Sequence, residues 1–113
     1  MQSIKKTKSF KIVYNSGRYK VNDCFAVHFL KNGSESTRLG ISVSKKVGNA
    51  VVRNKVRRLI KECCRLGFDD IAKGIDIVIV ARVGVNKLLE KEAFSNVDKS
   101  LRSLFKRLGL LNG

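Results

Sequence analysis

The 113-residue sequence has no proline and no tryptophan, a single histidine and few acidic residues. Nine Asp and Glu residues stand against 24 Lys and Arg residues, which gives a formal net charge of +15. Mutual repulsion of this size disfavours a compact chain unless an anionic partner balances it. The shortage of acidic residues therefore favours a polyanionic partner, with nucleic acid ahead of an anionic membrane surface.

The few acidic residues are also scattered, and this argues against catalysis by the chain itself. A protein nuclease needs clustered carboxylates for metal ions, or a paired general acid and base. Asp69 and Asp70 fall in a predicted connection, and Asp76 begins a predicted strand. His28 has no evident acidic partner in the sequence. We therefore expect no catalytic residue, no metal ligand and no cofactor bound by the protein alone.

Long apolar runs are missing as well. The longest, 77–81, predicts a buried strand and is far shorter than the ~20 residues that span a bilayer. The N-terminus is basic but has no apolar core after it, so we expect no signal peptide. Cys24, Cys63 and Cys64 are odd in number and suit neither a disulfide framework nor a zinc site. Free thiols are typical of a reducing compartment, so a cytoplasmic protein without a membrane partner is predicted.

A chain of this length can form one modest core but not two. We predict a single RNA-binding domain over residues 1–113, in which residues 1–6 form a flexible basic arm. Apolar spacing then predicts a helix at 7–16, strands from about 20 to 44, a helix at 49–66, a strand at 75–82 and a helix at 90–108. This order indicates an α/β sandwich in which helices pack on one small sheet.

The most informative stretch is RLGISVSKKVGNAVVRNKVRRLIKE, residues 38–62. It begins as an alternating strand, crosses a basic loop that contains Gly48, and enters a helix near Asn49. On that helix, apolar residues at helical spacing form one stripe that is predicted to be buried: Val52, Val56, Leu59, Ile60 and Cys63. In the last helix the predicted buried stripe is Phe94, Val97, Leu101, Leu104, Phe105 and Leu108.

The opposite face of the central helix is almost purely cationic. Eight basic residues and one acidic residue lie between Lys45 and Arg65. At ~100° per residue, the polar side chains collect away from the apolar stripe: Arg53, Asn54, Arg57, Arg58, Lys61 and Arg65. A merely solvated helix face normally mixes charges as i,i+4 pairs, and only Glu62 offers an opposite charge here. The face is therefore predicted to meet an anionic partner.

One face of the predicted sheet is too small and polar to form a dense core. It carries Ala26, His28, Gly40, Ser42 and Ser44. A shallow groove is expected there, with the aromatic residues of the first helix, Phe10 and Tyr14, as one wall. Aromatic rings beside cations suit single-stranded nucleic acid, whose bases stack on rings. The alternative is that these two rings only close a small core; spacing favours this for Phe10 and leaves Tyr14 open.

The string SVSKKVGNAVVRNKVRRLIKE resembles the signature of the bacterial ribonuclease P protein subunit, an arginine-asparagine-arginine type motif after a strand and a lysine-rich loop. SFKIVYNSGRYKVNDCFAVHF, GIDIVIVAR and KSLRSLFKRL resemble other parts of this family, so nearly the whole chain is covered. The resemblance implies an α+β two-layer sandwich of order α-β-β-β-α-β-α, similar to ribosomal protein S5 domain 2-like folds. Its four-stranded mixed sheet would contain a left-handed βαβ crossover.

The resemblance also implies a function, that of accessory subunit of a ribozyme that removes 5′ leaders from precursor tRNA by endonucleolytic cleavage. The implied partners are ribonuclease P RNA and precursor tRNA, with no protein partner. The RNA would perform the hydrolysis with bound Mg2+. Implied contacts to the ribozyme RNA are Lys45, Lys46, Arg53, Asn54, Lys55, Arg57, Arg58, Lys61 and Arg65. The implied leader groove consists of Phe10, Tyr14, Ala26, His28 and Ser42.

Two residues depart from the pattern of this family. Lys55 stands where arginine is common, which keeps the charge but loses the planar fork that binds phosphate bidentately. His28 stands where an aromatic residue, commonly tyrosine, is expected. One alternative function is a general or ribosomal protein that binds structured RNA without a role in cleavage. Another is a membrane-surface protein, which would need the apolar side of the basic helix exposed rather than buried in the core.

Overall fold

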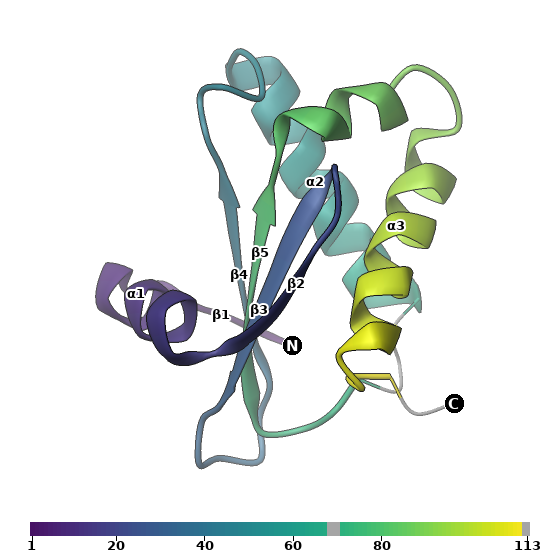
Figure 1. Ribbon diagram of the computed structural model, residues 1–113. Coiled ribbons are helices and arrows are strands. Elements are labelled where there is room, and N and C mark those ends of the chain that lie inside the picture. Colours follow the sequence, from purple (N-terminus) through teal and green to yellow (C-terminus); the bar gives the residue numbers. More distant parts are fainter. Residues whose placement is uncertain (68–70, 112–113) are drawn as a thin grey trace.

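The computed structural model describes residues 1–67 and 71–111 (Figure 1). Five strands form one mixed sheet in the order β1-β4-β5-β3-β2. β1 and β5 run parallel to β4, whereas β3 is antiparallel to β5 and β2. Asp69 and Asp70, which the sequence places in a connection, lie outside the described residues. The elements are β1 (Gln2–Ser3), α1 (Thr7–Ser16), β2 (Arg18–Val21), β3 (Phe25–Lys31), β4 (Arg38–Val43), α2 (Ala50–Gly67), β5 (Ile75–Ala81), the 3-10 helix η1 (Val83–Leu88) and α3 (Ala93–Arg107).

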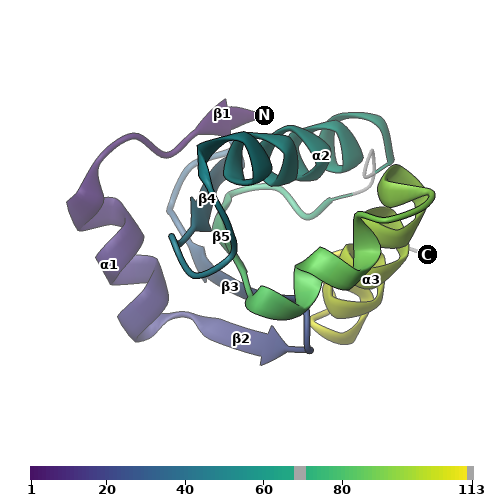
Figure 2. The same ribbon diagram turned by 90° about the horizontal axis from the view of Figure 1, so that it is seen from above.

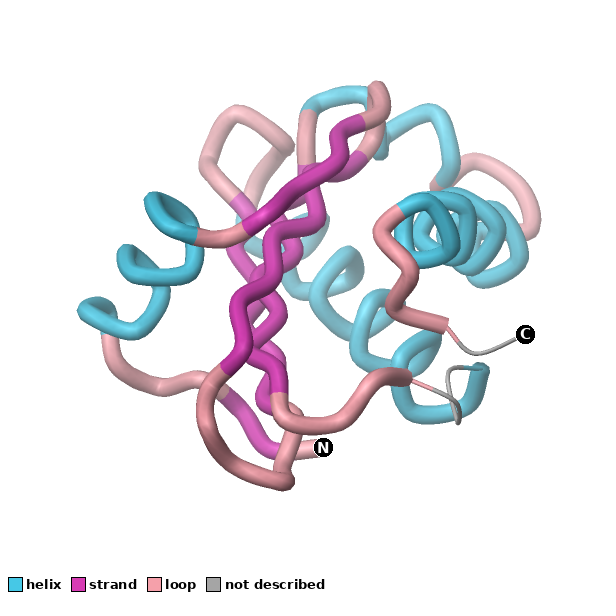
Figure 3. The backbone as a smooth tube through the Cα atoms, turned by 60° about the horizontal axis from the view of Figure 1, so that its bottom comes forward, coloured by secondary structure: helices cyan, strands magenta, loops and turns pink. Residues whose placement is uncertain are grey.

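The sheet separates α1 from the other two helices (Figures 1 and 3). α2 and α3 pack on one face and form the predicted sandwich with it, and α1 adds a partial layer on the other face. The larger core contains fully buried side chains from the sheet and both helices: Phe25, Val27, Ile77, Ile79, Val56, Ile60, Leu101 and Leu104. The smaller core under α1 contains Ile4, Val13 and Val78. Burial on both faces explains why β5 is nearly all Ile and Val.

The connection from β4 through α2 to β5 joins two neighbouring parallel strands. Viewed from the α2 side with both strands pointing up, β5 lies to the left of β4 (Figures 1 and 2). The crossover is therefore left-handed, as the family resemblance implies. About 98% of such crossovers are right-handed, so periodicity alone would have led to the wrong hand.

The sheet has five strands rather than the predicted four, because residues 1–6 do not form a separate arm. Gln2 and Ser3 pair with Arg38 and Leu39 of β4, and the Ile4 N–H donates to the Leu39 carbonyl at 2.9 Å. Ile4 is buried beneath α1. A two-residue strand is too short to show alternation, so its pairing depends on tertiary contacts that the sequence pattern does not reveal.

The C-terminal helix also begins later than predicted. The segment before it contains η1 (Val83–Leu88), and α3 starts at Ala93. Phe94 was predicted on the buried stripe, but its side chain is 41% exposed because it lies in the first turn of α3, at the edge of the core. The other stripe residues, from Val97 to Leu108, are buried as predicted.

Candidate nucleic-acid interface

The basic loop before α2 is held at both ends by hydrogen bonds. The Val47 N–H donates to the Ser44 carbonyl at 3.1 Å, and Asn86 Nδ2 of η1 donates to the Val47 carbonyl at 2.8 Å. Val47 itself is buried, whereas the adjacent Lys45 and Lys46 are exposed. The loop therefore presents its two lysines to solvent from a fixed backbone.

Asn49 connects this loop to the helix. Its Oδ1 accepts a hydrogen bond from the Val52 N–H at 3.0 Å, which is the arrangement of an N-cap. No acidic residue occupies the first turn of α2. The positive end of the helix dipole is thus left uncompensated beside Lys45 and Lys46, and this favours an anion there.

α2 divides into a buried side and a cationic side, as its sequence predicts. Val56, Ile60 and Cys63 are fully buried. On the other side Asn54, Arg58, Lys61 and Arg65 are exposed, and Arg53, Lys55 and Arg57 are half-buried. We call this set of seven residues together with Lys45 and Lys46 the basic face. It brings together all the residues for which the resemblance implies contact with ribozyme RNA.

Few interactions within the protein neutralise the basic face. Arg65 pairs with Glu62 at 3.1 Å, and Arg57 Nη1 donates to Asn54 Oδ1 at 3.1 Å. The second contact fixes the guanidinium of Arg57 without cancelling its charge. Arg53 Nε is buried and has no hydrogen-bond partner among the described residues. The face thus keeps most of its positive charge available for an external anion.

A membrane surface does not fit the basic face. The apolar side of α2 belongs to the core and cannot enter a lipid interface without unfolding the domain. Across the described ranges, no helix combines the length and the apolarity needed to cross a bilayer.

The second surface is the face of the sheet on which α1 lies, and α1 covers only part of it. The strand register places side chains in rows across β4, β5, β3 and β2. The row Gly40, Val78, His28 and Tyr19 lies under or beside α1, where Val13 packs on Val78. The next row, Ser42, Val80, Ala26 and Val21, continues toward the Lys45 loop. Because Ser42 and Val21 are exposed and Val80 is half-buried, α1 leaves much of this second row open to solvent. We use the name groove for this open part of the sheet face together with Tyr14, His28 and Tyr19.

Phe10 takes the structural role that spacing favoured. It is half-buried and packs against Gly40, where an added Cβ would lie 2.6 Å from the Phe10 ring. Glycine at this position thus lets the ring approach β4 closely. Tyr14, one turn later, remains 56% exposed and forms the wall of the groove.

Tyr14, His28 and Tyr19 form a continuous aromatic stack. The ring centroids of Tyr14 and His28 lie 4.5 Å apart with an interplanar angle of 29°, and those of Tyr19 and His28 lie 5.2 Å apart at 26°. His28 is only 6% exposed, so it lies in the floor of the groove while the two tyrosines flank it. Burial lowers the pKa of His28, which favours the neutral ring at neutral pH.

Sequence reasoning missed Tyr19 as a groove residue. Its place depends on the register that sets Tyr19 of β2 opposite His28 of β3. The apolar residues at positions 19 and 21 alternate with polar ones, and this was the available signal. Such alternation shows which face of the sheet the side chains occupy only once the pairing of β2 is known. The groove residues that were predicted, Phe10, Tyr14, Ala26, His28 and Ser42, do lie on this one face of the sheet.

The cysteines are placed for packing rather than for nucleophilic chemistry. Burial raises the pKa of the Cys63 and Cys64 thiols to about 12, so both stay protonated at neutral pH. Within residues 1–67 and 71–111, no group of three or more His, Cys, Asp and Glu side chains could hold a metal ion.

Comparison with known proteins identifies the family of the chain. A family model described as Ribonuclease P matches residues 1–109. The protein named Ribonuclease P protein component from Clostridioides difficile (strain 630) is 47% identical over 108 residues, covering 94% of this chain and 90% of its own length. A protein of the same name from Exiguobacterium sibiricum is 43% identical over 108 residues, covering 95% and 90%.

Solved structures agree at the level of the whole fold. The RNase P protein of Staphylococcus aureus matches with a TM-score of 0.87 and 34% identity, over 99% of each chain. The RNase P protein of Thermotoga maritima matches with a TM-score of 0.85 and 34% identity, over 100% of each chain. Since the family model, the relatives and the folds all span nearly the full length, the chain belongs to the ribonuclease P protein family.

Proposed function

We propose that the chain acts as the protein subunit of ribonuclease P, binding the catalytic RNA with its basic face and the 5′ leader of precursor tRNA in its groove. The observation that carries this proposal is the presence of two open surfaces of different chemistry on one small domain. The basic face is cationic and convex, because it is one side of a helix. The groove is aromatic and largely uncharged.

The basic face suits a structured RNA. Its charged side chains come from a helix and from a loop that hydrogen bonds hold in place. The distances between these charges are therefore fixed, and they can match the phosphates along an RNA backbone. Asn54, which already positions Arg57, can also donate to and accept from RNA groups. Lys55 is half-buried and supplies charge without a planar fork.

The groove suits a single strand. Tyr14 and Tyr19 expose more than half of their surface, and bases of any identity can stack on such rings. Beyond Ser42, β4 continues into the Lys45 and Lys46 loop, so cations stand at one end of the groove floor for the leader phosphates. A precursor has these contacts and a mature tRNA does not, so the groove would favour substrate over product.

In this proposal, phosphodiester hydrolysis belongs to the partner RNA with Mg2+ bound to it. The protein contributes by screening the repulsion between two RNAs and by aligning the leader. Its free cysteines fit a reducing compartment, and we place the complex in the cytoplasm.

The deciding experiment mixes the chain with the ribonuclease P RNA of its source and a precursor tRNA at low Mg2+. Restored cleavage at the mature 5′ end supports the proposal. Correct cleavage by the purified protein without RNA would contradict it. Binding to structured RNA with no effect on cleavage would instead indicate a general RNA-binding protein.

The groove makes a separate prediction. Tyr14→Ala removes an exposed stacking ring, so the affinity of the holoenzyme for leader-bearing precursor should fall about tenfold, while its affinity for mature tRNA should not change. Binding of both RNAs is measured by fluorescence anisotropy at one salt concentration. Ile12→Ala, at an exposed position on the same helix but outside the groove, is the matched control. Equal losses for the two RNAs would remove the groove from the leader path.

A further inference from the structure

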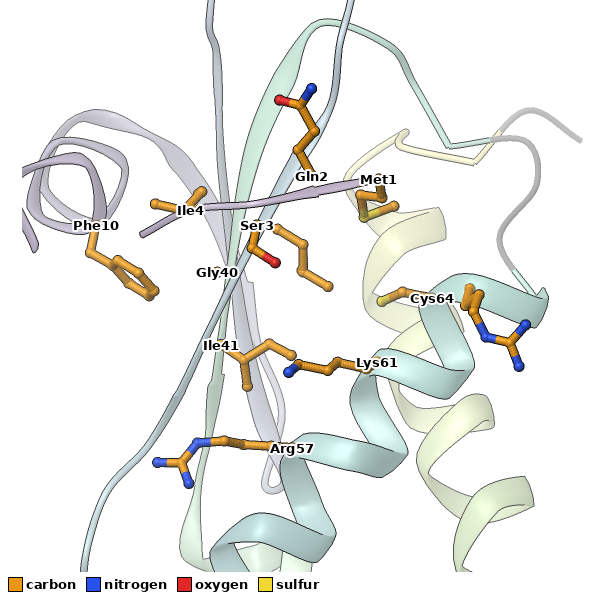
Figure 4. A pocket seen from close by; sticks show the side chains of 12 residues that line it. Met1, Gln2, Ser3, Ile4, Phe10, Gly40, Ile41, Arg57, Lys61 and Cys64 are labelled. Carbon is orange, nitrogen blue, oxygen red and sulfur yellow. The ribbon is translucent and has the colours of Figure 1, made fainter. Parts of the chain in front are cut away.

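A cavity of about 610 Å3 opens at the edge of the sheet, between β4 and α2 (Figure 4). It is separate from the Tyr14–His28–Tyr19 groove. Its volume falls within the range of small-molecule sites, about 300–1,000 Å3. Among the described residues, those that line it include no acidic one: Met1, Gln2, Ser3, Ile4, Phe10, Leu39, Gly40, Ile41, Arg57, Lys61, Cys64 and Arg65.

The wall nearest the sheet offers unpaired backbone groups. β1 accompanies β4 only at Arg38 and Leu39, after which no described strand continues along that edge. The Leu39 carbonyl faces β1, since it accepts from the Ile4 N–H. In a parallel ladder, alternate residues direct their backbone groups to the same side, so the N–H and carbonyl of Ile41 face this open edge. They provide one donor and one acceptor beside the cavity.

The wall nearest α2 supplies positive charge. Arg57 and Lys61 are one turn apart, and the Lys61 side chain extends toward Ile41 across the opening (Figure 4). Neither has an ion pair among the described residues, whereas Arg65 is engaged with Glu62. An anion at the mouth would therefore meet two available cations.

The remaining wall is apolar. Leu39 and Ile41 are half-buried on the α2 face of β4, so each keeps part of its surface for a ligand. Ile4 and Phe10 close the cavity from the other face of β4, where the Phe10 ring packs on Gly40. An occupant must thus combine a flat or apolar body, a hydrogen-bonding edge and a negative group.

We propose that this cavity binds one unstacked nucleotide, with its base against Leu39 and Ile41 and its phosphate between Arg57 and Lys61. The Ile41 N–H and carbonyl would pair with the base edge, which in every base carries hydrogen-bonding groups. Such a nucleotide can belong to the partner RNA, and in that case the inference rests on the proposed function. It can also be a free mononucleotide.

The first test uses nucleoside 5′-monophosphates as probes, with amide NMR shifts of the full chain as readout. Millimolar nucleotide should shift the amides of Gly40 and Ile41. Inorganic phosphate at the same ionic strength should leave the Ile41 amide in place, and the unphosphorylated nucleoside should bind several-fold more weakly. The absence of any shift at Ile41 with all four nucleotides would overturn the proposal.

The second test fills the cavity without removing a cation. Ser3 is exposed and its side chain lies at the cavity, so Ser3→Trp should block the site (Figure 4). Ser103→Trp, on the exposed side of α3, adds the same bulk elsewhere as a control. Thermal unfolding of both variants checks that the fold is kept. Ser3→Trp should abolish the mononucleotide shifts, and Ser103→Trp should preserve them.

Binding of ribonuclease P RNA by the same variants separates the two sources. A loss of about tenfold for Ser3→Trp alone assigns the site to a nucleotide of the RNA, because stacking one base contributes affinity of that order. Lost mononucleotide binding with unchanged RNA affinity assigns it to free nucleotides. If wild-type chain fails to bind the RNA at all, the proposed function fails, and the mononucleotide result stands independently. Shifts caused by an extended acidic peptide but not by nucleotides would overturn the proposal in favour of strand addition.

Discussion

At the scale of single residues, His28 shows how the groove keeps a titratable side chain neutral. It lies between two tyrosine rings, and its Nδ1 is buried with no hydrogen-bond partner among the described residues. A charged imidazolium would be poorly solvated there, which is why burial lowers its pKa. The departure from the tyrosine that the family resemblance implies therefore retains a flat ring but adds sensitivity to acid.

This sensitivity predicts a pH dependence of stability. The pKa of His28 is below 6.5 in the folded chain and near 6.5 in the unfolded chain, so the unfolded state binds more protons between these values. Stability should therefore fall as pH drops below about 6.5, and His28 should have no effect above that range. Urea midpoints measured from pH 7.5 to 5 should fall more for wild type than for His28→Phe.

Asp76 does not confuse this comparison. The hydrogen bond from Arg38 holds the pKa of the Asp76 carboxyl below 3.8 in the folded chain. The stability that Asp76 contributes is therefore lost only below about pH 3.8, outside the range measured for His28. Parallel urea profiles for wild type and His28→Phe would show that burial of His28 does not affect stability in this range.

The residues of the groove also show where sequence reasoning reaches its limit. Spacing could assign Phe10 to a core, and the contact with Gly40 confirms this. It could not decide Tyr14, because the extent of exposure depends on how far α1 covers the sheet. Tyr19 was missed because its neighbours depend on strand register.

At the scale of elements, β4 and α2 were the most predictable because their signals are local. Alternation, a helix start near Asn49 and one apolar stripe all lie within residues 38–66, and the structure confirms each of them. β1 and η1 escaped prediction because nothing in their own few residues distinguishes them from loop. The left-handed crossover came from resemblance alone, since general rules favour the opposite hand.

The cap of α2 gives a prediction at this scale. Asn49→Ala removes the acceptor of the Val52 N–H, which should lower the free energy of unfolding by about 1 kcal/mol. Val51→Ala is the control, because Val51 is 77% exposed and its loss should change stability by less than about 0.5 kcal/mol. Both values come from urea unfolding followed by circular dichroism. Equal effects of the two substitutions would mean that Asn49 does not cap the helix.

The packing of α1 against the sheet gives a second prediction at this scale. Gly40 has no positive φ, so alanine strains no backbone there, but its Cβ would meet the Phe10 ring at 2.6 Å. Gly40→Ala should destabilise the domain by about 1–3 kcal/mol, the usual cost of overpacking. In a Phe10→Leu background the same change should cost much less, because the ring atoms in conflict are gone. A double-mutant cycle measures this coupling, and additive losses would disprove the contact.

At the scale of the whole molecule, charge is distributed so that one side remains unbalanced. Arg38 and Arg102 form ion pairs with Asp76 and Asp98 away from the basic face. Arg58 has no ion pair among the described residues. Folding thus places the apolar side of α2 inside and leaves its cations for a partner, and this arrangement links the stability of the core to the presentation of the basic face.

The salt dependence of RNA binding tests this arrangement. Each phosphate contact releases counterions, so the logarithm of affinity falls with the logarithm of salt by about 0.7–0.9 per contact. Arg58→Ala should weaken binding to ribonuclease P RNA and reduce the slope by about that amount. Lys106→Ala removes an exposed charge from the last turn of α3, outside the basic face, and should leave the slope unchanged. Affinities are measured between 50 and 400 mM salt. If both substitutions reduce the slope equally, RNA binding depends on the net charge of the protein and not on the position of the charges on α2.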